Sequence, residues 1–277
     1  MVFRSGSFRL KHDTFFDNEI DNYDLVVAVG ARMAYPQYLK GQKVLQIDID
    51  DEEIGRNYDN TEGINGDAKK SLSELIETLK VSMPPAKSKE AEISKLKSDR
   101  YNPETIIEPQ HSFVQAIRKA MPDDGILISG MTQIGYYSRN RYEVYEPRTY
   151  VTSGYYGNLG YAYPTALGAK VAQPDKAVVA VSGDGGFMFN VQELSTAAKH
   201  NINVVLVVFN DNAYGNVMRD QVNMFEGREY GAQLDSPALM KVSEDIGVRG
   251  VTVEGADDID RQSGGLGNCG SHRGHRN

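Results

Sequence analysis

Two apolar runs, separated by a segment with the pattern of a helix, constrain the fold of this chain most strongly. The runs, at residues 177–181 and 204–209, are rich in β-branched side chains and have the length of buried parallel strands. The segment between them, residues 190–200, carries its apolar side chains on one helical face, and Asn190 with Glu193 predicts a capping box at its start. Strand–helix–strand units have right-handed crossovers, so both strands are expected to end at the same edge of one sheet.

Glycine and acidic residues follow both strands at that edge. The first strand leads into Gly183-Asp184-Gly185-Gly186, and the second leads into Asn210-Asp211-Asn212. Ligands of open α/β folds bind at the carboxyl ends of the strands. Glycines allow backbone N–H groups to approach a phosphate, and aspartates supply the hard oxygen ligands that Mg²⁺ takes together with substrate phosphates. The pattern predicts a metal–diphosphate site; the alternative is a plain strand–helix–strand unit with a tight turn.

Length, charge and cysteine content limit the class of protein. A chain of 277 residues suits one large or two ordinary domains, and its net charge of −8 argues against a nucleic-acid partner. No apolar run has the length of a membrane span, and no signal peptide opens the chain, so no membrane association is expected. The single cysteine, Cys269, fits a reducing compartment, and we expect a cytoplasmic protein.

The remaining patterns predict an α/β fold with Rossmann-like three-layer domains and parallel sheets. Residues 1–81 are expected to form part of a Rossmann-like domain, with strands at 24–30 and 44–50 and a helix that Asp67 caps. Residues 82–109 have the composition of a linker, and residues 110–256 are predicted to form a doubly wound domain with further strands at 125–130 and 249–254. Residues 257–277 lose all apolar periodicity and predict an irregular or disordered tail.

The polar strand ends resemble the diphosphate-binding motif of thiamine-diphosphate (ThDP) enzymes, in which Gly-Asp-Gly is followed at a fixed interval by Asn-Asn. Here Asp184 and Asp211 are separated by 27 positions, which matches that family's register. The resemblance implies that the metal ligands are the side chains of Asp184 and Asp211 and the backbone carbonyl of Ala213. The family usually has Asn where Asp211 stands; Asp can also coordinate Mg²⁺ and adds negative charge.

Two further segments resemble acetolactate synthase-like members of the same family. In residues 152–164, the resemblance implies that the Gly157 carbonyl accepts a hydrogen bond from the cofactor's 4′-amino group and that Leu159 is the apolar wedge beneath the bent cofactor; an ordinary core leucine is the alternative. In residues 130–133, it implies that Gln133 donates to the diphosphate, although Ile134 stands where a His often follows. The cofactor-binding residues implied are Gly130, Gln133, Gly157, Leu159, Gly183, Asp184, Gly185, Gly186, Asp211, Ala213 and Tyr214.

The front segment resembles the second half of the family's central domain. In acetolactate synthases that domain holds FAD, and Arg32 would lie near it. Many relatives lack FAD, so FAD use is left open, and a surface or domain-packing role for Arg32 is an equal alternative.

The resemblance implies a ThDP- and Mg²⁺-dependent enzyme that decarboxylates a 2-keto acid and transfers the acyl-type carbanion to a second carbonyl. The activating glutamate is expected in a pyrimidine-binding domain that the matched segments do not include, so no catalytic residue is assigned. We therefore expect the chain alone to be inactive and the full-length enzyme to be a homodimer or homotetramer. A non-oxidative 2-keto acid decarboxylase or lyase and a non-catalytic phosphate-binding module remain as alternatives.

Overall fold

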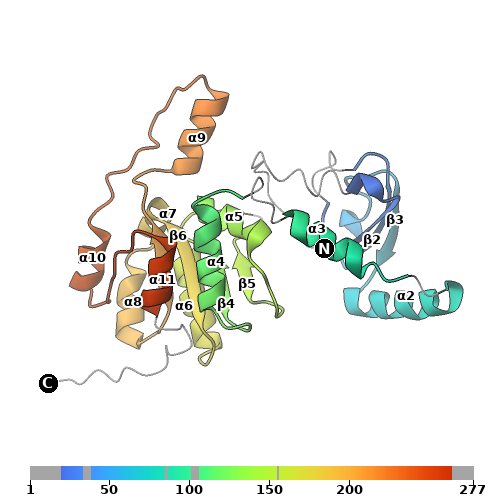
Figure 1. Ribbon diagram of the computed structural model, residues 1–277, viewed down its shortest axis with the longest axis horizontal. Coiled ribbons are helices and arrows are strands. Elements are labelled where there is room, and N and C mark those ends of the chain that lie inside the picture. Colours follow the sequence, from blue (N-terminus) through green and yellow to red (C-terminus); the bar gives the residue numbers. More distant parts are fainter. Residues whose placement is uncertain (1–19, 34–38, 85–86, 101–105, 155, 264–277) are drawn as a thin grey trace. The chain divides into compact units, whose positions relative to one another are not determined.

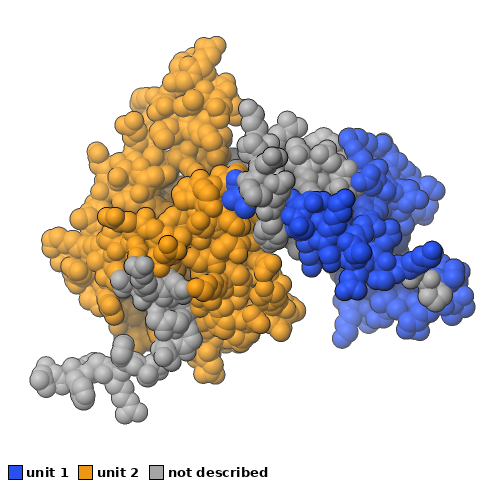
Figure 2. Space-filling view, in the orientation of Figure 1, with its two compact units in different colours: residues 1–106 blue, residues 107–277 orange. Residues whose placement is uncertain are grey.

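The computed structural model describes residues 20–33, 39–84, 87–100, 106–154 and 156–263. The chain divides into two compact units, residues 1–106 and residues 107–277, which are coloured separately in Figure 2. Both units contain a parallel sheet, as the sequence predicted (Figure 1). Among the helices described, none is both long enough and apolar enough to cross a membrane.

Unit 1 is built on a three-stranded parallel sheet. The strands β1 (Leu25–Val29), β2 (Lys43–Asp48) and β3 (Thr61–Asn65) follow one another in that order across the sheet. The first two confirm the predicted strands. The third has the sequence TEGIN, whose polar residues and glycine hid it from a search for apolar runs. Its glycine, Gly63, is needed because a Cβ there would lie 2.2 Å from Cγ2 of Ile54.

Two short 3-10 helices and two α-helices complete the described part of unit 1. These are η1 (Ile20–Asn22), η3 (Asp51–Glu53), α2 (Ala68–Ser82) and α3 (Glu90–Arg100). The Asp67 side chain accepts a hydrogen bond from the Lys70 N–H at 3.0 Å, which confirms the predicted N-cap of α2. Helix α3 lies in the segment that we expected to be a linker, where strong helix formers are present without an apolar face.

Unit 2 contains a four-stranded parallel sheet with the order β5-β4-β6-β7. Its strands are β4 (Ile126–Ser129), β5 (Tyr150–Thr152), β6 (Val178–Gly183) and β7 (Val205–Phe209). The predicted strands at 125–130, 177–181 and 204–209 are confirmed, and β5 was not predicted because it has only three residues. The predicted strand at 249–254 is wrong, since residues 249–253 form neither strand nor helix.

Helices lie on both faces of the unit 2 sheet. On one face α6 covers β4 and β6, where Ile128, Ala166 and Ala180 are completely buried. Side chains that alternate with these, such as Leu127 and Val179, point to the opposite face and are also buried. The helices are α4 (Gln110–Ala120), α5 (Gln133–Arg141), α6 (Ala162–Ala172), α7 (Asp184–Met188), α8 (Glu193–His200), α9 (Gly215–Met224), α10 (Leu239–Asp245) and α11 (Ala256–Ser263).

Two expectations about helix ends need correction. The segment 190–200 has no capping box: α8 begins only at Glu193, and the Asn190 side chain donates instead to the Gly160 carbonyl at 2.6 Å. The prediction of an irregular tail is wrong for residues 257–263, which belong to α11, a helix that packs against α4. Among residues 256–259, the part of α11 whose burial is described, only Ile259 is buried, which is too little for a periodic signal. Residues 264–277 lie outside the described part of the chain.

Candidate metal and diphosphate site

The register of β6 and β7 brings the two predicted metal-binding aspartates together. Gly183 at the end of β6 pairs with Phe209 at the end of β7. Asp184 is the first residue of α7, directly after β6, and Asp211 lies two positions after β7. Both carboxylates therefore stand at the carboxyl edge of the sheet, where the sequence placed them, and α7 follows the end of β6 in Figure 1.

Asp184 is a buried carboxylate with one partnered and one unpartnered oxygen. Only 1% of the residue is exposed to solvent. Its Oδ2 accepts a hydrogen bond from the Ser236 hydroxyl at 2.6 Å, whereas Oδ1 is buried and has no hydrogen-bond partner. Burial of an ionised carboxylate is unfavourable unless a cation or a full set of donors compensates for the lost water. The unpartnered Oδ1 is therefore suited to bind a metal ion.

The pKa of the Asp211 carboxyl depends on the nearby charge of Asp184. Loss of part of its water shell raises the pKa of the Asp211 carboxyl above its usual value, and the neighbouring Asp184 charge raises that pKa further. Hydrogen bonds from the backbone of residues 211 and 213 act in the opposite direction. Two carboxylates that repel each other at a strand edge are the donors that a divalent cation would bring together. A hard, oxygen-preferring cation such as Mg²⁺ fits these residues.

Gln133 also reaches this site. A Cβ placed on Gly215, the first residue of α9, would lie 2.8 Å from Oδ2 of Asp211 and 3.0 Å from Nε2 of Gln133. The Gln133 amide and the Asp211 carboxylate thus meet around a glycine that has no side chain to separate them. The Gln133 Oε1 accepts a hydrogen bond from Gln110 Nε2 at 3.2 Å, which leaves its amide nitrogen directed away from that contact.

Of the two glycines after Asp184, Gly185 is required by close packing and Gly186 is tightly packed. A Cβ on Gly185 would lie 2.5 Å from the ring of Tyr214 and 2.9 Å from Cδ1 of Leu234. A Cβ on Gly186 would lie 3.1 Å from the Ser182 hydroxyl and 3.7 Å from the Leu159 side chain. Gly185 therefore allows Tyr214 to cover α7.

The segment around Gly157 is fastened beside the same helix. Gly157 and Gly160 both adopt positive φ, at 55° and 78°, a region that favours glycine. The hydrogen bond from Asn190 to the Gly160 carbonyl holds the segment against the end of α7. A Cβ on Gly157 would lie 3.2 Å from Cε of Met131, so this segment also adjoins the loop after β4.

That loop lies against the end of β6. The Gly130 N–H donates to the Val181 carbonyl at 2.8 Å, and a Cβ on Gly130 would approach the same oxygen to 2.6 Å. Thr132 lies within 3.5 Å of the Cβ position of Gly183. All the cofactor-binding residues predicted from the sequence thus belong to one connected region of unit 2.

Sequence reasoning missed several side chains of this region. Ser236 and Gln110 hydrogen-bond to predicted site residues, and Asn216 places a buried, unpartnered Oδ1 at the start of α9. No periodicity or motif marks these positions, because long-range chain contacts bring them to the site. Within the described residues, no group of three or more His, Cys, Asp or Glu side chains that could hold a metal occurs. The metal ligands predicted from the sequence are instead two carboxylates and one backbone carbonyl.

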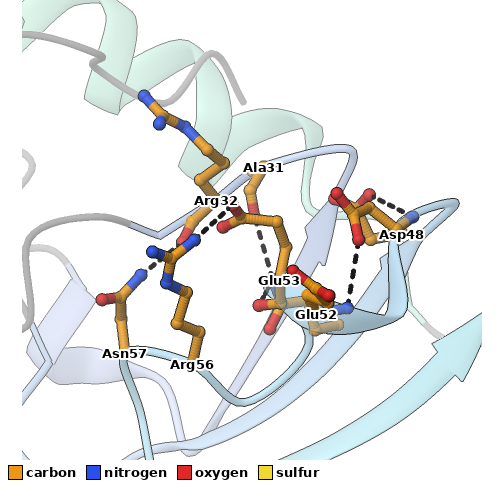
Figure 3. Close-up of polar contacts among 9 residues, drawn as sticks. Ala31, Arg32, Asp48, Glu52, Glu53, Arg56 and Asn57 are labelled. Atoms are coloured by element: carbon orange, nitrogen blue, oxygen red, sulfur yellow. Dashed lines mark hydrogen bonds and ion pairs between the residues drawn. The ribbon is translucent and has the colours of Figure 1, made fainter.

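Arg32 lies in unit 1, in a separate set of polar contacts (Figure 3). Its carbonyl accepts a hydrogen bond from Asn57 Nδ2 at 2.9 Å, while Glu53 pairs with Arg56 at 2.8 Å. The Gln46 amide donates to the carbonyls of Ala31 and Glu53, which fixes the loop after β1. In Figure 3 the Arg32 side chain extends away from the Glu53–Arg56 pair. These contacts explain the loop's conformation without assigning it a ligand.

Two family models match the chain. "Thiamine pyrophosphate enzyme, C-terminal TPP binding domain" matches residues 130–264, and "Thiamine pyrophosphate enzyme, central domain" matches residues 6–75. The chain therefore belongs to the thiamine pyrophosphate (thiamine diphosphate) enzyme family. Neither description names a flavin, and FAD takes no part in the function proposed below.

Curated relatives agree with this assignment. An acetolactate synthase large subunit from Buchnera aphidicola subsp. Schizaphis graminum is 30% identical over 91% of the chain and 46% of its own length. A sulfoacetaldehyde acetyltransferase from Castellaniella defragrans is 27% identical over 85% of the chain and 45% of its own length. The chain thus spans about half the length of the curated relatives that it matches.

A solved structure supports the fold. The thiamine diphosphate-dependent 4-hydroxybenzoylformate decarboxylase of Rhodococcus jostii RHA1 superposes with a TM-score of 0.72 at 22% identity. The match covers 91% of this chain and 47% of the decarboxylase. This likeness confirms the α/β fold with parallel sheets.

The packing at Gly185 generates a prediction. In Gly185→Ala the new methyl group would displace the Tyr214 ring, and overpacking of this kind lowers the free energy of unfolding by about 1–3 kcal/mol. In the matched control Gly168→Ala, the exposed helical position has no atom within 4 Å of the new Cβ. This control should raise the free energy of unfolding by about 0.5–1 kcal/mol. Urea unfolding of both variants measures the contrast, and equal effects would contradict the close packing.

Proposed function

We propose that unit 2 binds the diphosphate of ThDP through Mg²⁺ at the carboxyl edge of its sheet. The observation that carries this proposal is the buried Asp184 carboxylate, whose Oδ1 has no protein partner. Asp184 and Asp211 supply side-chain oxygens to the cation, and Ala213 supplies its backbone carbonyl. Mg²⁺ retains open coordination positions for phosphate oxygens, which matches a site with so few protein ligands.

The surrounding residues position the rest of the cofactor. Gly185 and Gly186 bring the backbone of α7 close to the diphosphate, and Gln133, beside Asp211, donates a hydrogen bond to it. Gly157 presents its carbonyl to the aminopyrimidine, and Leu159, next to Gly186, supports the bend between the two rings. Gly130, Gly183 and Tyr214 complete the wall of the site.

The reaction of the whole enzyme is proposed to resemble that of acetolactate synthases. Bound ThDP supplies a carbon nucleophile that allows decarboxylation of a 2-keto acid and transfer of the resulting acyl-type carbanion to a second carbonyl. Acetolactate synthase large subunits from several organisms are about 30% identical to this chain, which favours carboligation. A structural neighbour that is a decarboxylase keeps non-oxidative decarboxylation as the second candidate.

Removal of the Asp184 charge tests the metal site. We expect Asp184→Asn to weaken Mg²⁺-dependent ThDP binding strongly, because the amide oxygen carries no negative charge to offset that of the cation. The same change should leave the ligand-free protein at least as stable, since it removes a buried charge that lacks a full set of partners. Isothermal titration calorimetry and thermal unfolding measure both effects. Asp245→Asn, at an exposed carboxylate of α10 that pairs with Lys241, is the control. Undiminished binding in Asp184→Asn, or preference for ATP or NAD, would contradict the proposal.

A turnover assay tests whether this chain needs the domain to which the activating glutamate is assigned. We expect purified chain 1–277, with ThDP and Mg²⁺, to give no carboligation or decarboxylation of pyruvate, because the activating glutamate is assigned to a domain outside the matched segments. Product analysis with pyruvate, alone and with an aldehyde acceptor, measures this. Product formation by the chain alone would refute the expectation. For the full-length enzyme, the same assay separates carboligation from simple decarboxylation.

A further inference from the structure

Ser236 connects a distant part of the chain to the candidate metal ligand. It lies 52 positions after Asp184, in the segment between α9 and α10, and its hydroxyl donates to Asp184 Oδ2 at 2.6 Å. Hydrogen bonds from a hydroxyl to an ionised oxygen at this distance belong to the strong class.

The backbone around Ser236 pairs with the loop that contains Asp211 and Ala213, here called the metal loop. Residues 232–236, here called the strap, run antiparallel to residues 212–214, with Ala213 opposite Gln233. The Tyr214 N–H donates to the Ala232 carbonyl at 2.7 Å, and the Leu234 N–H donates to the Asn212 carbonyl at 2.7 Å. The strap is therefore paired with the loop that holds both Asp211 and Ala213.

The far end of the strap is anchored in the core. Helix α10 begins at Leu239, and its Leu239 and Val242 pack against the buried cluster that contains Phe187 of α7. Ser236 thus lies between two fixed points, the metal loop and the packed helix. Its hydroxyl is held in place before any ligand binds, which reduces the entropy lost on forming the site.

The two carboxylate oxygens of Asp184 consequently have different surroundings. Ser236 occupies Oδ2, and Oδ1 is left buried without a partner. A carboxylate that binds Mg²⁺ through one oxygen needs its other oxygen satisfied, and outer hydrogen bonds of this kind fix the orientation of metal ligands. The alternative arrangement, in which Ser236 blocks the oxygen that the metal needs, predicts the opposite effect of removing the hydroxyl.

We propose that Ser236 is a positioning residue for the divalent cation: its hydroxyl fixes the Asp184 carboxylate with Oδ1 facing the cation. The same hydrogen bond couples the strap to the bound Mg²⁺–diphosphate. This inference rests on the function proposed above and adds a residue to it, because neither the sequence motif nor the metal ligands include residues 232–236.

Metal titration tests the role of the hydroxyl. Mg²⁺ is titrated into the full chain at saturating ThDP, in the parent protein and in Ser236→Ala, Ser236→Thr and Ser243→Ala. Loss of an outer hydrogen-bond partner weakens metal binding by roughly ten- to a hundredfold. We expect that loss in Ser236→Ala and recovery to within about threefold in Ser236→Thr, which restores the hydroxyl donor. Ser243, a half-buried serine that donates to the Met240 carbonyl in α10, is the matched control and should leave Mg²⁺ affinity unchanged.

Proteolysis tests the coupling of the strap. Arg228 is exposed in the segment that leads from α9 to the strap, and Lys97 is exposed in α3 of unit 1. We expect Mg²⁺ and ThDP to slow trypsin cleavage after Arg228 in the parent protein and in Ser236→Thr, but less in Ser236→Ala, at ligand concentrations that give equal occupancy. Cleavage after Lys97 should not change, so it serves as the internal control.

The outcomes separate this inference from the function on which it rests. Absence of Mg²⁺-dependent ThDP binding in the parent protein would overturn both. Binding in the parent protein with equal or tighter Mg²⁺ affinity in Ser236→Ala would overturn the positioning role alone. Equal losses in Ser236→Ala and Ser236→Thr, or a comparable loss in Ser243→Ala, would also overturn it, because the hydroxyl would then not be the determinant.

Discussion

The parallel pairing of β6 with β7 is the constraint on which the site depends. Because both strands end at the same edge of the sheet, the polar residues that follow them lie close together as soon as the strands pair. Asp184 becomes buried at that point, and its charge requires compensation that the described residues supply to only one oxygen. A divalent cation is the simplest partner for the other oxygen, which explains why a stable fold retains such a costly group.

The positions of the glycines determine how closely the surrounding loops and helices approach the carboxyl edge of the unit 2 sheet. Gly185 allows the Tyr214 ring to lie on α7, and Gly215 leaves room for Asp211 and Gln133 to meet. Gly130 brings the loop after β4 into backbone contact with β6. Each position joins a different loop to the same strand ends. Gly185, one of the glycines that suggested a phosphate site in the sequence, therefore also has a packing role.

The strands, and the position of the two candidate metal-binding aspartates at one sheet edge, could be predicted because their signals are local. Apolar runs mark β4, β6 and β7, and the polar residues follow them directly in the sequence. Elements without apolar contrast were missed: β3 contains Gly63, β5 has three residues, and the part of α11 whose burial is described, residues 256–259, buries only Ile259. A strand was wrongly predicted at 249–254, where short apolar alternation exists but no strand among the described residues pairs with the segment.

Contacts between distant segments could not be predicted from one sequence. Nothing near Ser236 indicates that it reaches Asp184, because only the pairing of residues 212–214 with 232–234 brings it there. The Asn190 capping box failed for a related reason, since tertiary contact with Gly160 competed with the local helix cap. Local motifs thus predicted Asp184 and Asp211 as candidate ligands, whereas the contacts made by Ser236 and Asn190 depend on the folded chain.

The most direct test of the metal–diphosphate site is the location of the cation itself. Crystals of the chain grown with ThDP and Mn²⁺, which substitutes for Mg²⁺, would be measured at the manganese absorption edge. A single anomalous peak within coordination distance of Asp184 Oδ1 and the Asp211 carboxylate, next to diphosphate density, is the predicted result. ThDP bound with its diphosphate elsewhere, or a peak that lies away from both aspartates, would contradict it.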